Sequence, residues 1–93
     1  MSAEGFPRQI NNGKTRAVVR ICGDEYIIRG DAEEEYIRHL AAIVDKKMRE
    51  VQTSHPNQPR HKLALLAAIN LADELERMRE ENKELMELIG EAK

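Results

Sequence analysis

The chain has 93 residues, with 15 basic and 17 acidic side chains, one Cys, no Trp, two Tyr and one Phe. A chain this short buries only about 60% of its unfolded surface, and a composition that is 41% apolar and 34% charged argues against an enzyme with a deep pocket. The net charge of −2 lacks the basic excess of a nucleic-acid-binding module, one Cys excludes an internal disulfide, and no apolar run reaches the roughly 18 residues of a membrane span.

Residues 1–14 show no hydrophobic period. They mix Gly, Pro, Asn and Gln, which is typical of a disordered leader. The same segment lacks the apolar centre of a secretory signal peptide. A cytoplasmic location is therefore expected.

From Thr15 the apolar residues alternate with period two, which predicts a half-buried strand. Gly23-Asp24 is predicted to form a two-residue type II′ turn into a second strand. With Cys22 opposite Glu25, one register satisfies both strands. The two predicted faces are Ala17, Val19, Ile21, Tyr26 and Ile28 on one side, and Arg16, Val18, Arg20, Ile27 and Arg29 on the other.

A first helix is predicted over residues 32–53. Asp31 suits its N-cap, and Glu34 stands where the partner of a capping box belongs. The two prolines and the Asn within residues 54–59 end the helix. Apolar residues recur at steps of three and four along one stripe: Ile37, Leu40, Val44, Met48 and Val51.

A second, long helix is predicted from near Pro59 or His61, with no breaker until Gly90. Its first half, residues 63–69, is apolar nearly all the way round, so it must be buried on several sides at once. The first helix and a small hairpin cannot cover all of it. A second copy of the chain is expected to complete the core.

The second half of this helix carries a heptad seam, with Leu75 at position a. Asn82 falls at another a position, where a polar residue fixes register. The apolar stripe widens at Met86 and Leu88, which favours a four-helix assembly near the tail and a dimer near the head. The residues expected to mediate self-association are Leu66, Ile69, Leu71, Leu75, Met78, Asn82, Leu85 and Ile89.

The expected fold is α+β: an N-terminal β-hairpin followed by two helices, the second long and coiled-coil-forming, in an obligate oligomer. The leader, residues 1–14, precedes a head over residues 15–75 and a tail over residues 76–93. No Gly-rich phosphate loop, His-Glu-x-x-His or Cys-x-x-Cys is present, and no histidine has a second ligand at usable spacing. A protein that is not an enzyme and has no metal or cofactor is therefore expected.

Three segments resemble the ZapA family of Z-ring-associated cell division proteins: residues 21–30 (ICGDEYIIRG), 42–51 (AIVDKKMREV) and 62–75 (KLALLAAINLADEL). The resemblance covers about residues 15–90, and the short tail looks like the brief versions common in Gram-positive-type bacteria. It implies a non-catalytic protein that binds FtsZ, the tubulin-like division GTPase, and bundles its protofilaments into the ring at midcell. It also implies dimers or tetramers and reduced FtsZ GTPase activity. From the charge and the composition, neither binding to nucleic acid nor insertion into membrane is expected.

Two groups of residues are candidate FtsZ contacts. Arg16, Arg20 and Arg29 form a cationic strip on the outward face of the hairpin. Such a strip either meets an acidic filament surface or only keeps an exposed edge soluble. Asn70 is a mediocre helix former off the seam and matches an Asn typical of the family; it either faces a partner or anchors the loop to the hairpin.

Two alternative functions stay open from the sequence. A ribbon-helix-helix-like DNA-binding dimer shares the strand-helix-helix order and the arginines on a strand. The second strand, the net charge and the length of the second helix weigh against it. The other alternative is a coiled-coil adaptor with another client.

Overall fold

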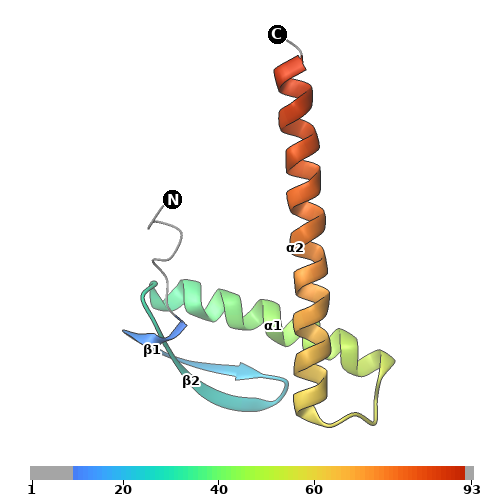
Figure 1. The fold of residues 1–93 in the computed structure, drawn as a ribbon. Helices are drawn as coiled ribbons and strands as arrows, with labels where there is room; N and C mark the ends of the chain where they lie inside the picture. Colours follow the sequence, from blue (N-terminus) through green and yellow to red (C-terminus); the bar gives the residue numbers. More distant parts are fainter. Residues whose placement is uncertain (1–9, 92–93) are drawn as a thin grey trace. The chain divides into compact units, whose positions relative to one another are not determined.

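The structure, a computed structural model, describes residues 10–91; residues 1–9 of the predicted leader lie outside this part. An antiparallel hairpin is followed by two helices, the second of them long, as predicted. The chain divides into two compact units, one up to Glu50 and one from Val51. The elements, labelled in Figure 1, are β1 (Ile10–Ile21), β2 (Asp24–Gly30), α1 (Glu34–Ser54) and α2 (Arg60–Glu91).

The hairpin turn differs from the predicted one by a single position. Cys22 and Gly23 form the two-residue loop, with φ angles of 52° and 90°. Two positive φ values identify a type I′ turn, whose backbone twist matches the twist of the strands. The expected type II′ turn at Gly23-Asp24, with Cys22 opposite Glu25, is therefore wrong. Ile21 instead pairs with Asp24. Every pair is displaced by two residues, so each side chain keeps its predicted face.

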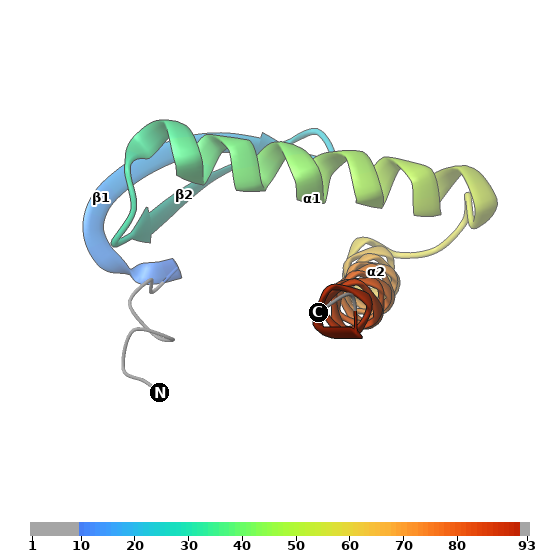
Figure 2. The ribbon, with the colours of Figure 1, turned by 90° about the horizontal axis from the view of Figure 1, so that it is seen from above.

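The first strand is longer than predicted. It begins at Ile10 instead of Thr15, so the expected leader is wrong in its last part. Ile10 and Thr15 both pair with Gly30 across a bulge, and β1 curls at this end (Figure 2). A Cβ at Gly13 would overlap the backbone of Gly30. The absence of a side chain at Gly13 therefore allows β1 to continue past the end of β2.

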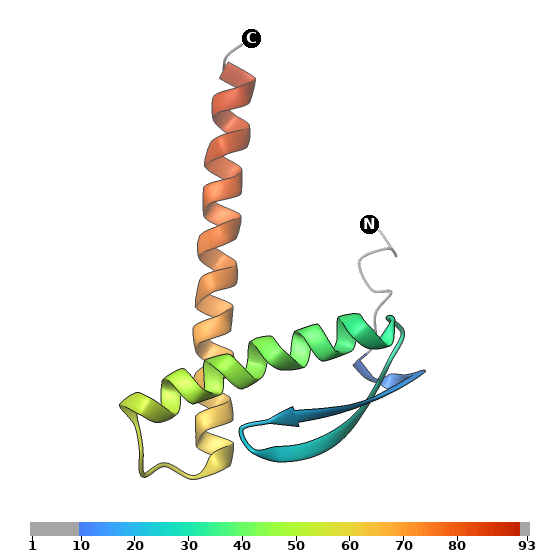
Figure 3. The ribbon, with the colours of Figure 1, turned by 180° about the vertical axis from the view of Figure 1, so that it is seen from behind.

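The core of the first unit lies between the hairpin and α1. Figure 3 shows α1 running along the hairpin, and Ala17 and Val19 of β1 are buried with Ile37 and Ala41 of α1. The apolar side chains on one face of β1 thus pack against the apolar side of α1. Ile21, Ile28 and Ala32 pack around this cluster.

The two helices agree with the predicted patterns, with small corrections at their ends. On α1, Ile37, Met48 and Val51 are buried, and the other two stripe residues are half-buried. The amide of Ile37 donates to the carbonyl of Glu33 at 3.0 Å. Because α1 begins after Glu33, Asp31 is not its N-cap, and the predicted start was two residues early.

The long helix α2 spans 32 residues, or about 48 Å at about 1.5 Å per residue. The amides of Lys62 and Leu63 donate to the carbonyl of Pro59, so Pro59 immediately precedes the helix. Gly90 does not end it, since α2 continues to Glu91. Neither described helix is long and apolar enough to cross a membrane.

Candidate functional site

The outer face of the hairpin is the face turned away from the core cluster. Three cross-strand pairs follow one another along it: Arg16 opposite Arg29, Val18 opposite Ile27, and Arg20 opposite Glu25. We call this set the outer face. The predicted cationic strip of three arginines therefore lies on one side of the hairpin, as expected from its period.

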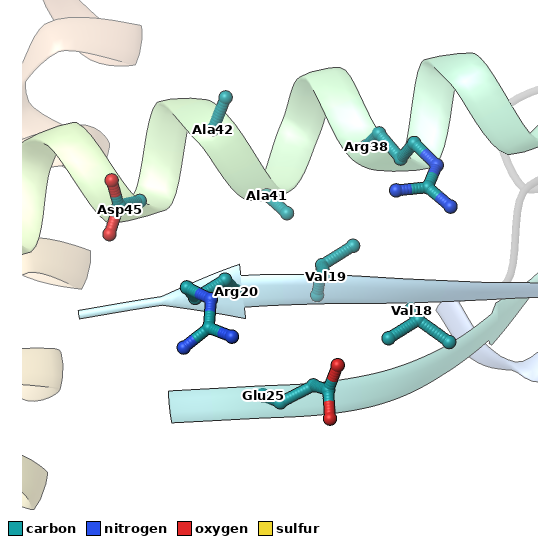
Figure 4. A pocket seen from close by; sticks show the side chains of 8 residues that line it. All are labelled: Val18, Val19, Arg20, Glu25, Arg38, Ala41, Ala42 and Asp45. Atoms are coloured by element: carbon teal, nitrogen blue, oxygen red, sulfur yellow. The ribbon is translucent and has the colours of Figure 1, made fainter. Parts of the chain in front are cut away.

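A hollow of about 470 Å³ adjoins this face between β1 and α1 (Figure 4). Its apolar lining comes from both elements, and charged side chains surround it. No nucleophile with an adjacent base lines it, and residues 10–91 hold no cluster of three or more potential metal ligands. The lining residues are Val18, Val19, Arg20, Glu25, Arg38, Ala41, Ala42 and Asp45.

Asp45 ties the hairpin turn to α1. Its Oδ1 accepts a hydrogen bond from the backbone N–H of Cys22 at 2.6 Å, and its Oδ2 accepts one from Nε of Arg49 at 2.9 Å. The bond from Cys22 lowers the pKa of Asp45; partial burial opposes this, and the hydrogen bond and charge of Arg49 add to it. The carboxylate thus satisfies a backbone donor in a loop residue with positive φ.

Sequence reasoning missed this role, although Asp45 lies within one of the family-like segments. The available signal was an Asp inside a helix, where it is a poor helix former, four residues before an Arg. That signal explains only the pair with Arg49. The contact with Cys22 spans 23 positions and has no local pattern.

Replacing Asp45 by Asn is expected to lower the free energy of unfolding by about 1 kcal/mol at pH 7, because a charged acceptor makes the stronger hydrogen bond. The lowered pKa means that the stabilisation is complete above the usual value of 3.8 and is lost as pH falls through the folded value. Urea unfolding at several pH values should therefore show wild type and variant converging in acid.

The control is Asp73→Asn, because Asp73 pairs with Arg77 on the exposed surface of α2. Exposed pairs contribute little, so this variant should unfold almost as wild type does. An equal loss in both variants, or a difference between wild type and Asp45→Asn that does not change with pH, would contradict the role of Asp45.

The predicted self-association residues all lie on α2, and most are exposed within the single chain. Leu66 and Leu71 are half-buried, whereas Ile69 is 56% exposed. Near the tail, Met78, Asn82 and Leu85 line a second hollow of about 470 Å³. The remaining seam residues, Leu75 and Ile89, are also exposed.

Asn70 is exposed on α2 and belongs to the second compact unit, whereas the three arginines belong to the first. Within the described part of the second unit, Asn70 makes no hydrogen bond to the loop that precedes α2. The two groups of candidate contacts therefore stay separate proposals.

Comparison with known proteins identifies close relatives. The family model described as "Cell division protein ZapA" matches residues 18–93. The Cell division protein ZapA of Bacillus licheniformis is 38% identical over 78 residues, covering 84% of this chain and 92% of the relative. That of Bacillus pumilus is 37% identical over 75 residues, covering 81% and 88%. A solved structure, "ZapA mutant dimer from Geobacillus stearothermophilus", has 40% identity and a TM-score of 0.61, covering 84% and 91%.

Proposed function

The chain belongs to the cell division protein ZapA family, and on this premise we propose that it binds FtsZ, promotes assembly and bundling of its protofilaments, and dampens its GTPase activity. The protein acts without catalysis of its own and is located in the cytoplasm at the midcell division site. The observation that carries the proposal is the family match over residues 18–93. No observation favours the DNA-binding dimer or an adaptor with another client.

Self-association is part of the proposal. The solved relative is described as a dimer, and α2 carries exposed apolar residues along much of its length, among them Leu65, Ile69 and Leu75. Apolar surface of this extent is typical of a helix that packs against another chain. We propose a dimer through residues 63–75 and a coiled-coil tail over residues 76–93 that joins two dimers.

The proposed FtsZ contacts are Arg16, Arg20 and Arg29 on the outer face and Asn70 on α2. All four residues are exposed. Solvent-exposed side chains on rigid elements are available to a partner without any change in the fold.

Sedimentation of FtsZ polymers in GTP, with and without the chain, tests the proposal. The amount of FtsZ in the pellet should rise, the chain should pellet with it, and GTP hydrolysis per FtsZ should fall. FtsZ in GDP and the chain alone are the controls, and both should stay in the supernatant. If pelleted FtsZ does not rise, the proposed function is wrong.

A further inference from the structure

Two arginines face each other across the hairpin. Arg16 of β1 lies directly opposite Arg29 of β2, and both are exposed. Residues paired in this way have Cβ atoms about 4.5–5.5 Å apart, and like charges at that distance destabilise a sheet. Among residues 10–91, neither guanidinium takes part in a hydrogen bond or an ion pair.

Solubility alone does not account for this pair. Two pairs further along the same face, Arg20 lies opposite Glu25, so opposite charges also occur on this face. Such a pair keeps an edge charged without repulsion. The pair of Arg16 and Arg29 therefore lowers the stability of the hairpin, whereas the pair of Arg20 and Glu25 does not. An anion bound between the two arginines would remove the repulsion.

The pair next to the arginines is apolar. Val18 lies opposite Ile27, and Ile27 is 51% exposed although it is a large apolar residue. The hollow adjoins the same face, since Val18, Arg20 and Glu25 line it (Figure 4). The outer face thus presents a cation pair next to an apolar pair, and the hollow opens along the edge of this face, between β1 and α1.

The net charge of the outer face is opposite in sign to the net charge of the whole chain. The outer face carries three arginines and one glutamate, whereas the whole chain has a net charge of −2. A complementary surface is therefore acidic.

We propose that the outer face binds an acidic segment of the partner, with one carboxylate held between Arg16 and Arg29 and an adjacent apolar side chain packed on Val18 and Ile27. Two guanidinium groups around one carboxylate satisfy both cations and give a charge-assisted contact. This inference rests on the proposed function for the identity of the partner as FtsZ, and it specifies the chemistry that the partner presents.

The variants Arg16→Gln and Arg29→Gln test the inference through two opposite effects. Removing either charge relieves the repulsion, so Tm should rise by about 1–4 °C. The same change removes half of the carboxylate site, so the affinity for FtsZ in the sedimentation assay should fall at least about tenfold. A purely structural role would move stability and binding in the same direction.

The matched control is Arg77→Gln, which removes the same charge from an exposed position on α2. It should leave the affinity for FtsZ unchanged. If Arg16→Gln and Arg29→Gln bind FtsZ as tightly as wild type does, the inference is wrong and the proposed function stands.

A second arm does not depend on FtsZ. A synthetic peptide with alternating Asp and Leu should shift the backbone amide NMR signals of Arg16, Val18, Ile27 and Arg29, and the Asn–Leu version of the peptide should not. If the Asp–Leu peptide gives these shifts while the chain fails to pellet with FtsZ, the proposed function fails and the chemistry of the face is supported. Equal shifts with both peptides, or none, would overturn the inference.

The acidic part of α2 in a second copy is the other possible occupant of this face. Residues 61–93 contain eight acidic and five basic side chains. If the arginines bound that segment, Arg16→Gln would change the oligomeric state in sedimentation equilibrium. An unchanged oligomer supports the inference, and a dissociated one contradicts it.

Discussion

Replacing Ile69 by Asp is expected to abolish dimerisation and folding together, and the same result is expected for Leu66→Asp. Ile69 is 56% exposed in the single chain, and Leu65 beside it is 58% exposed. If a second copy covers this surface, the new carboxylate becomes a buried, unpaired charge. Such a charge costs about 3–5 kcal/mol, a large part of the 5–15 kcal/mol or so that stabilises a typical domain.

Sedimentation equilibrium gives the oligomeric state of these variants, and far-ultraviolet circular dichroism gives their helix content. Lys62→Asp is the control, because Lys62 is exposed in the first turn of α2, where an acidic residue suits the helix dipole. It should remain a folded oligomer. A well-folded monomer of Ile69→Asp, or a dimer as tight as that of wild type, would contradict the proposed dimer core.

The faces of the hairpin were predictable from the sequence, but the register was not. Alternation with period two decides which side chains share a face, and a displacement by two residues leaves that decision intact. Which of these registers forms is determined by the type and position of the turn. Cys22 at φ 52° is an unusual turn residue, so a Gly at the first central position was the stronger signal.

This difference in register matters for the candidate site. Only the observed register places Arg16 opposite Arg29, so the sequence could predict a cationic face but not a repulsive pair. The contact of Asp45 with Cys22 and the close approach of Gly13 to Gly30 escaped prediction for a related reason. Both join residues far apart in the chain, and a single such contact leaves no period in the sequence.

The last prediction concerns the tail of α2. Bundling is expected to require two dimers joined through their tails, whereas FtsZ binding is expected to require only one dimer. Four large apolar residues near its end are exposed in the single chain, more than a two-stranded seam uses. They are Leu85, Met86, Leu88 and Ile89. Antiparallel tails would place heads at both ends of a particle, separated by helices that are each about 48 Å long.

If the proposed tetramer forms, Ile89→Glu is expected to split it into dimers. Ile89 is 54% exposed in the single chain, and a glutamate there adds a like charge to a tail that already contains Glu84 and Glu87. The dimer core at residues 63–75 should stay intact. Sedimentation velocity should show a dimer, the variant should still pellet with FtsZ, and electron micrographs should show single filaments instead of bundles.

Lys83→Gln is the matched control, since it makes the same change in net charge at an exposed position off the predicted seam. It should keep both the tetramer and the bundles. Undiminished bundling by a proven Ile89→Glu dimer would contradict the tail model, because the two heads of one dimer would then be enough to join filaments. Loss of FtsZ binding together with bundling would also contradict it, because the tail would then be needed for the contact itself and not only for linking the heads.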